Sequence, residues 1–161
     1  TSGKVYINGT DIFAMNDDEL AIFRRRQVGI IYQFYNLIPI LNVEENMAIP
    51  MELDGRKVEK AQMDDMLLRL GLTERRTHLP NELSGGQQQR TSIGRALITR
   101  PSIVLADEPT GNLDTKASNE IMHLLKTSNR ELNQTIIMIT HNMELAKAAD
   151  RTIMIEDGKI R

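Results

Sequence analysis

Three short apolar runs, each followed by polar side chains, constrain most strongly how this chain can fold. They cover Val28–Tyr32, Ile103–Ala106 and Ile136–Ile139, with helical patterns between them. Strands that alternate with helices form a parallel sheet with helices packed on it. The second and third runs are uniformly apolar, so we interpret them as strands buried on both faces. The pattern predicts an α/β fold with a mostly parallel central sheet.

Capping residues and apolar side chains at helical spacing mark the helices. Asn16 stands three residues before Glu19, and Ser84 precedes two glycines; both are favoured N-cap residues. Gly71 suits the C-terminal cap of a helix. Five helices are predicted at Asn16 to about Arg25, Val43–Leu53, Val58–Leu70, Gly85–Ile98 and Met143–Ala149. A sixth is predicted from side chains that share one helical face: Ile121, Leu124, Leu125, Ser128 and Leu132. Two further strands are predicted at Lys4–Ile7, before the turn at Asn8 and Gly9, and at Thr152–Ile155, before the turn at Asp157 and Gly158.

Composition sets broad limits on the class of protein. The chain has 161 residues, of which 40% are hydrophobic and 26% charged, enough for one domain with a core. Its net charge of −2 gives no bulk attraction to nucleic acid, and we interpret Arg24–Arg26 as a solvated helix end. The absence of cysteine fits a reducing cytosol. No apolar run approaches the roughly 20 residues of a membrane span.

Each of the three apolar runs ends in side chains that can do chemistry. Gln33 follows the first run, Asp107 and Glu108 follow the second, and His141 follows the third. Ligands of open parallel sheets bind at the carboxyl ends of the strands, where these side chains should meet. His78 and His123 lack such neighbours, and we assign them no role.

The residue types at the strand ends suggest separate roles. Asp107 suits a magnesium-associated carboxylate, although a capping aspartate is a common alternative. Glu108 suits the positioning or deprotonation of an attacking water, the alternative being a surface glutamate. Pro109 should restrict Glu108 to extended backbone, so that the two carboxylates point in different directions. His141 could donate to a phosphoryl oxygen or be an ordinary strand-end histidine, and the Gln33 amide could orient a water or touch the metal shell.

The stretch Leu83–Arg90, LSGGQQQR, places bare backbone at a helix start. Ser84, Gly85 and Gly86 would expose N–H groups at the positive end of the helix dipole. A flexible turn with an N-cap would explain the serine and one glycine only. The stretch therefore indicates an anion site, most plausibly for a phosphate.

LSGGQQQR, IVLADEP, GNLD and ITH, in this order, resemble the motifs of an ATP-binding-cassette (ABC) ATPase over essentially the whole chain. The segments YQFYNLIPILNVEENM and EPTGNLD resemble the macrolide-export and lipoprotein-release branch, which includes a cell-division relative. By this resemblance Leu83–Gln87 is the signature motif, Ile103–Asp107 is the Walker B strand and Asn112–Asp114 is the D-loop. Glu108 is the catalytic glutamate, His141 is the switch histidine and Gln33 is the Q-loop glutamine.

The resemblance implies a P-loop NTPase-like parallel-sheet core with an inserted helical subdomain. Residues 1–36 would form the first part of the core with the Q-loop, residues 37–81 the helical subdomain, and residues 82–161 the signature helix and the rest of the core. The implied cofactors are ATP and Mg²⁺. Nucleotide contacts are expected from Ser84, Gly85, Gly86, Gln87 and Asp114, magnesium contacts from Asp107 and Gln33, and catalysis from Glu108, His141 and Gln33.

The resemblance also implies partners. Family members work as head-to-tail dimers, in which ATP lies between one subunit and the signature motif of the other. A transmembrane permease would be the second partner, contacted by the helical region and by the segment after Gln33. The protein would then be cytoplasmic, held at the inner face of the membrane only by the permease, with no nucleic-acid partner. A signalling module, a non-catalytic remnant and a DNA-repair or translation ABC protein are the alternatives.

The family's phosphate loop, G-x-x-x-x-G-K-[ST], does not occur between Thr1 and Arg161. We therefore expect a truncated or partial sequence that binds ATP poorly by itself. Loss of a central strand and of the helix after it should expose apolar sheet edge and face. Gly94 stands where relatives carry alanine, and glycine inside a helix costs about 1 kcal/mol.

Overall fold

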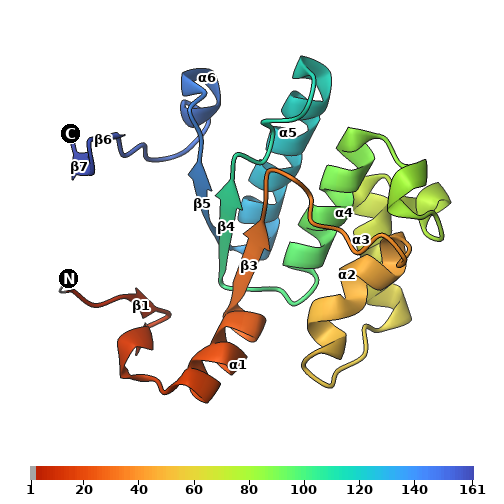
Figure 1. The fold of residues 1–161 in the computed structure, drawn as a ribbon, viewed down its shortest axis with the longest axis horizontal. Coiled ribbons are helices and arrows are strands. Elements are labelled where there is room, and N and C mark those ends of the chain that lie inside the picture. The colour runs from red at the N-terminus through yellow and green to blue at the C-terminus, as the bar shows by residue number, and fades with distance from the viewer. Residues whose placement is uncertain (1–2) are drawn as a thin grey trace.

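The computed structural model describes residues 3–161 and has a central three-stranded parallel sheet (Figure 1). Its strands are β3 (Val28–Ile31), β4 (Ile103–Asp107) and β5 (Thr135–Ile139), paired in the order β3-β4-β5. The chain passes from β3 to β4 through three helices and from β4 to β5 through one. The predicted α/β fold with a parallel sheet is therefore confirmed, and the strands agree with the predicted runs to within one residue.

The helices begin and end close to the predicted residues. Their bounds are α1 Asp17–Gln27, α2 Val43–Glu52, α3 Lys60–Leu70, α4 Gly85–Leu97, α5 Thr115–Leu132 and α6 Met143–Ala146, with short 3-10 helices at Ile12–Ala14, Thr73–Arg75 and Pro80–Glu82. Asn16 and Ser84 both form capping boxes, and Gly71 ends α3 in the left-handed region at φ 64°. Local hydrogen bonding thus sets these boundaries, which explains why the sequence predicts them.

Two hairpins lie outside the central sheet. The first joins β1 (Tyr6–Ile7) to β2 (Thr10–Asp11), and the second joins β6 (Ile155–Glu156) to β7 (Lys159–Ile160). The turn residues between the strands have positive φ in both hairpins, as the predicted turns require. The strand predicted at Thr152–Ile155 is nevertheless wrong, because only its last residue pairs. Beyond the paired residues, the Met154 carbonyl accepts from the Arg161 N–H at 3.0 Å, while Thr152 and Ile153 lie outside the ladder.

The sheet is buried on one face only, which corrects the prediction of strands buried on both. Ile31, Val104 and Ala106 are at most 2% exposed. On the opposite face a cross-strand row remains partly open to solvent, with exposed fractions of 41% for Ile30, 38% for Leu105 and 49% for Ile137. Helix α4 packs on β3 and α5 on β5, both on the buried side. A uniformly apolar strand sequence therefore does not show whether one face of the sheet is covered or both.

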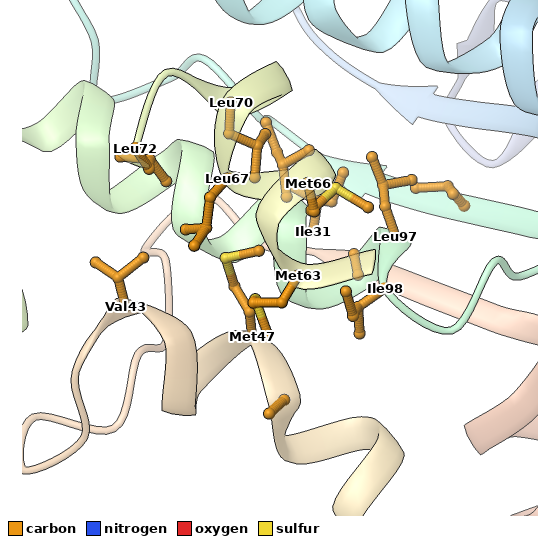
Figure 2. Packing of buried hydrophobic residues seen from close by; sticks show 14 of the residues in the cluster. Ile31, Val43, Met47, Met63, Met66, Leu67, Leu70, Leu72, Leu97 and Ile98 are labelled. Carbon is orange, nitrogen blue, oxygen red and sulfur yellow. The ribbon is translucent and has the colours of Figure 1, made fainter. Parts of the chain in front are cut away.

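Much of the buried apolar core lies where α2, α3 and α4 meet (Figure 2). Met47, Met63 and Leu67 are at most 2% exposed there. Gly94 of α4 faces this cluster, and a Cβ built on it would lie 2.6 Å from Leu70 Cδ1 and 2.7 Å from Met47 Cε. Glycine at this position thus lets α4 approach its neighbours closely. The sequence interpretation counted only its helix-propensity cost.

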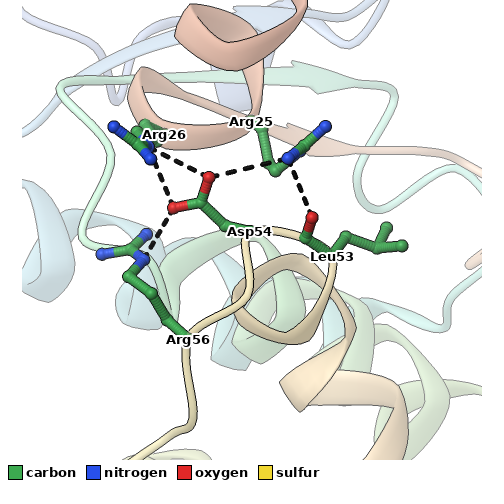
Figure 3. Close-up of polar contacts among 5 residues, drawn as sticks. All are labelled: Arg25, Arg26, Leu53, Asp54 and Arg56. Carbon is green, nitrogen blue, oxygen red and sulfur yellow. Dashed lines mark hydrogen bonds and ion pairs between the residues drawn. The ribbon is translucent and has the colours of Figure 1, made fainter.

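A charged cluster joins the end of α1 to the end of α2 (Figure 3). The Asp54 carboxylate, 2% exposed, accepts from Arg26 Nε at 2.9 Å and pairs with Arg56 Nε at 2.7 Å and Arg25 Nη1 at 3.6 Å. Arg25 also donates to the Leu53 carbonyl at 2.8 Å. The interpretation of Arg24–Arg26 as a merely solvated helix end is therefore wrong for Arg25 and Arg26, because their partner carboxylate comes from a distant element, whereas Arg24 is exposed.

Helices α2 and α3 occupy the region predicted as a helical subdomain, and the described part of residues 37–81 contains no strand. Asn46, fully buried on α2, fixes the preceding segment by accepting from the Ile38 N–H at 2.8 Å and donating to the Leu41 carbonyl at 2.7 Å. One continuous apolar cluster connects these helices to the sheet. The division into three parts stays a prediction.

Candidate functional site

The carboxyl ends of β3, β4 and β5 lie at one edge of the sheet, where the three arrows of Figure 1 point the same way. The strands are in one-to-one parallel register up to their last residues. The structure therefore brings to one edge the residues predicted from the strand ends: Gln33, Asp107, Glu108 and His141. Their chemical roles stay predictions.

Glu108 and His141 contact each other directly across β4 and β5. Glu108 Oε1 lies 2.7 Å from His141 Nδ1 and accepts from the His141 backbone N–H at 2.7 Å. Thr140 Oγ1 donates to Glu108 Oε2 at 3.2 Å. The glutamate side chain is 17% exposed and the histidine side chain 84%. The carboxylate is thus held from one side, with the imidazole facing solvent.

The backbone of Glu108 is left-handed, with φ 43°, so the predicted extended conformation is wrong. Its N–H donates to the Ile139 carbonyl at 2.9 Å, and its carbonyl accepts from the Gly111 N–H at 3.0 Å. A proline disfavours the right-handed helical region for the residue before it, and the tight turn formed here uses the left-handed region. Asp107 makes none of the Glu108 contacts, and the prediction that the two carboxylates point in different directions stays a prediction.

Two opposing effects act on the Glu108 carboxyl. Its partial burial raises the pKa, and the hydrogen bonds from the backbone and side chain of His141 and from Thr140 lower it by more. The net pKa lies below the ordinary glutamate value. Glu108 is therefore ionised at neutral pH, the state in which it accepts a proton.

The contact with a carboxylate also orients the proton on the imidazole. Because Glu108 is ionised, Nδ1 of His141 carries the hydrogen that it shares with Oε1. The outward ring nitrogen, Nε2, is then an acceptor in the neutral ring and a donor in the imidazolium. Donation to a phosphoryl oxygen in this arrangement thus requires the protonated ring.

Asp107 ends β4 with an exposed side chain. Its carboxylate accepts no hydrogen bond from residues 3–161 and forms no ion pair with them. Those residues also contain no group of three or more acidic, histidine or cysteine side chains that could hold a metal. Magnesium is usually held by one or two carboxylates together with water and substrate phosphates, so a single free carboxylate fits an ion that arrives with a nucleotide.

Gln33 lies against the loop after β4. A Cβ built on Gly111 would stand 2.7 Å from Gln33 Nε2, so the Gln33 side chain packs directly on this glycine. Asn112 Nδ2 donates to the Gln33 carbonyl at 3.0 Å. The segment after β3 is therefore attached to the segment after β4 through Gly111 and Asn112, which both follow Glu108.

Ser84 and Gln87 are engaged with each other at the start of α4. Ser84 Oγ accepts from the Gln87 N–H at 3.3 Å, and Gln87 Oε1 accepts from the Ser84 N–H at 2.9 Å. The N–H groups of Gly85 and Gly86 have no acceptor among the described residues. This helix start therefore offers two free backbone donors, while the serine hydroxyl serves as a cap.

Asp114 caps α5, where Oδ1 accepts from the Ala117 N–H at 2.8 Å. The starts of α4 and α5 are neighbours, since a Cβ on Gly86 would lie 3.5 Å from Ala117 Cβ. Asp114 thus lies beside the glycines of α4 and not at the Glu108–His141 pair. A nucleotide-binding role for Asp114 stays a prediction.

Two residues of α4 that the sequence analysis did not single out hold the site loops. Gln89, fully buried, donates to the Pro109 carbonyl at 2.7 Å. Arg95 donates to the carbonyls of Tyr35 at 2.8 Å and Asn36 at 2.6 Å. The only signal in the sequence was a polar side chain within a helix that otherwise packs on the sheet.

None of the helices in the described part of the chain is long and apolar enough to cross a membrane.

Comparisons with known proteins agree with this geometry. The family described as ABC transporter matches residues 1–111, more than half of the chain. The ABC transporter ATP-binding protein YtrE of Bacillus subtilis is 46% identical over 163 residues, covering 100% of this chain and 71% of that protein. The lipoprotein-releasing system ATP-binding protein LolD of Colwellia psychrerythraea is 42% identical, covering 100% of this chain and 63% of that protein.

A solved structure has the same fold. It is the dimeric, post-hydrolysis ATP-binding cassette MJ0796 bound to ADP and Pi, with a TM-score of 0.85 and 38% sequence identity, covering 99% of this chain and 72% of that one. The chain thus spans about two thirds of the length of the relatives that it matches. It belongs to the ATP-binding subunits of ABC transporters, a family of ATP-hydrolysing enzymes.

Proposed function

We propose that this chain supplies two separate surfaces to ATP hydrolysis in a head-to-tail pair of ATP-binding subunits. One surface is the strand edge with Glu108 and His141, and the other is the start of α4 at Gly85 and Gly86. The observation that carries the proposal is the ionised, hydrogen-bonded Glu108 at the edge that also holds Asp107. The similar MJ0796 cassette is a dimer bound to ADP and Pi, which supports a pair of subunits that hold a nucleotide.

Glu108 would accept the proton of the attacking water. Its Oε1 already receives two hydrogen bonds, whereas Oε2 receives one at 3.2 Å and is the freer oxygen. His141 would hold the carboxylate in place and present its outward nitrogen to the phosphoryl group. Gln33, fixed against Gly111, would orient the water or touch the metal shell.

Asp107 would hold Mg²⁺ together with Gln33 and water. The ion, when bound with the nucleotide, neutralises charge on the phosphate oxygens. The free N–H groups of Gly85 and Gly86 would receive the terminal phosphate of a nucleotide held mainly by the partner subunit. Gln87 would support this contact by keeping Ser84 in its capping conformation.

The segment after Gln33 suits a protein partner. Phe34, Ile38 and Ile40 expose 71%, 41% and 81% of their surface, close to the buried Asn46 that fixes the segment. A transmembrane permease that contacts this segment and the helical region would place the chain on the cytoplasmic side of the membrane. The relatives named for lipoprotein release favour an export or lipid-type substrate for the assembly.

The signature surface is tested by complementation. The chain is mixed with a second ATP-binding subunit of the family that has its own phosphate loop but a disrupted signature serine, and magnesium-dependent ATP turnover is measured. Wild-type chain should restore turnover. Ser84→Asp should not, because aspartate keeps the N-cap but places a negative charge beside the phosphate. Restoration by Ser84→Asp, or no restoration by the wild type, would contradict the proposal.

The strand edge is tested by ATP turnover in an assembly in which the site that contains Glu108 is active. Glu108→Gln should lower turnover by about 100-fold or more, the usual range for loss of a general base. A second variant, His141→Ala, removes the imidazole from the strand edge. Its matched control is His123→Ala, because His123 is exposed on α5 and contacts none of the strand-edge residues. Equal turnover in Glu108→Gln and wild type would remove Glu108 from the mechanism.

A further inference from the structure

Gln89 on α4 contacts both loops that carry the proposed catalytic groups. Its Nε2 donates to the Pro109 carbonyl at 2.7 Å and reaches the Tyr32 carbonyl at 3.4 Å. Pro109 directly follows Glu108 in the chain, and Tyr32 directly precedes Gln33. The Gln89 amide therefore connects α4, which begins at Gly85, to the backbone next to Glu108 and Gln33.

The loops held in this way have unusual backbone conformations. Glu108 has φ 43°, and Tyr35 and Asn36, further along the first loop, have φ 50° and 48°. Left-handed conformations of residues other than glycine persist only where the surroundings fix them. Arg95, also on α4, donates to the carbonyls of both Tyr35 and Asn36. Helix α4 thus holds each strained loop through side chains that donate to its backbone.

The amide of Gln89 is not explained by packing alone. The side chain is fully buried, and its Oε1 has no hydrogen-bond partner among the described residues. A buried acceptor without a donor costs stability, so an apolar side chain of similar length would serve the core better. What the glutamine supplies is the donor to the two loop carbonyls.

We propose that Gln89 is a positioning residue that makes the start of α4 and the loops around Glu108 and Gln33 move as one unit. Gln89 is fully buried and acts through its hydrogen bonds to Pro109 and Tyr32. The consequence for catalysis rests on the proposed function, whereas the mechanical connection does not.

The connection is tested by amide hydrogen exchange in Gln89→Met, which removes the donor and keeps an unbranched side chain. Exchange in residues 110–113 and 33–36 should become about fivefold faster, since one hydrogen bond contributes about 1 kcal/mol. Exchange in the rest of α4 and in β4 should stay as in the wild type. Gln62→Met is the matched control, because Gln62 Nε2 also donates to a backbone carbonyl, that of Ile98, at 2.7 Å, but at the far end of α4.

Unchanged loop exchange in Gln89→Met would overturn the proposal, and so would faster exchange spread over the whole of α4 and β4. If this variant does not fold, Gln89→Glu gives the same test. A protonated glutamate has one O–H, which can donate to one of the two carbonyls, and an ionised one has no donor. Loop exchange, corrected for its intrinsic pH dependence, should therefore be slower at acid pH than at alkaline pH. An effect independent of pH would contradict the inference.

A kinetic arm separates positioning from nucleotide binding. In an assembly in which the chain turns ATP over, Gln89→Met should lower kcat about tenfold and leave KM for ATP unchanged. A rise in KM at constant kcat would show that Gln89 acts in binding and would overturn its role as a positioning residue. Absence of turnover in the wild type would count against the proposed function, while the exchange result would still decide the connection.

Discussion

The helical cluster of α2, α3 and α4 and the carboxyl edge of the sheet are built by different forces. In the cluster, Met47, Met63 and Leu67 are at most 2% exposed, and shape complementarity decides the arrangement. At the edge, His141 is largely exposed and Glu108 is held by three hydrogen bonds. The comparison indicates that substitutions in the cluster should change stability, whereas substitutions at the edge should change chemistry with little effect on stability.

The largest effect is expected from Leu67→Ala in the helical cluster. Leu67 is 1% exposed, and truncation of a buried leucine costs about 2–5 kcal/mol because a cavity remains. Leu68, the next residue, is 71% exposed, so Leu68→Ala should change the free energy of unfolding by about 0.5 kcal/mol or less. Urea denaturation followed by circular dichroism measures both. Similar losses in the two variants would show that burial does not decide stability here.

A smaller effect is expected where a methyl group is added between the sheet and α4. A Cβ at Gly29 would lie 2.5 Å from the Ala96 backbone oxygen, which cannot move without the helix, so Gly29→Ala should cost about 1–3 kcal/mol. At Gly94 the added Cβ meets only the ends of the Leu70 and Met47 side chains. Because those ends can rotate and alanine favours the helix by about 1 kcal/mol, Gly94→Ala should be nearly neutral.

The same denaturation experiment compares these two glycine variants. A large loss in Gly94→Ala with little loss in Gly29→Ala would mean that side-chain packing, and not the backbone contact, limits how closely α4 approaches.

The ion-pair cluster joining α1 to α2 should contribute less, and in a pH-dependent way. Burial raises the pKa of Asp54, but the hydrogen bond from Arg26 and the charges of Arg26, Arg56 and Arg25 outweigh it and leave the pKa below its ordinary value. Its stabilisation is therefore complete above the ordinary value, about pH 4, and is lost as pH falls through the lower folded-state value. The three guanidinium groups are partly exposed, so solvent screens the interaction.

Urea midpoints of wild type and Asp54→Asn, measured at pH 7 and near pH 3, check this expectation. The wild type should be more stable at pH 7, and the difference should shrink at the lower pH. A difference that does not depend on pH would mean that the carboxylate charge contributes nothing.

The smallest effect on stability is expected from His141→Ala at the strand edge. The backbone N–H of residue 141 still donates to Glu108, and an exposed ion pair is worth about 0–1 kcal/mol. Loss of the ring should raise the Glu108 pKa part of the way towards its ordinary value, because one of the lowering hydrogen bonds disappears. Carboxyl NMR titration measures the pKa, and urea denaturation measures the stability. An unchanged pKa would show that the ring does not hold the carboxylate.

Sequence reasoning located the site better than it described it. Gln33, Asp107, Glu108 and His141 could be placed at one edge because parallel strands share the direction of their carboxyl ends. The left-handed backbone of Glu108 could not be predicted, since it depends on hydrogen bonds to Ile139 and Gly111.

The other residues whose role the sequence did not reveal have hydrogen-bond or ion-pair partners far away in the chain. Asp54 meets Arg26 across 28 residues of sequence, and Gln89 meets Pro109 across 20. No local pattern records such pairs.

The sequence by itself determined the order of strands and helices, the helix caps at Asn16, Ser84 and Gly71, and the family. These features depend on neighbouring residues or on the order of short motifs, which the chain carries in any conformation. The tertiary structure alone decided which face of the sheet is covered, how closely α4 packs at Gly94, and which side chains hold Glu108 and Gln33. Those outcomes arise from contacts between distant residues, which exist only once the chain has folded.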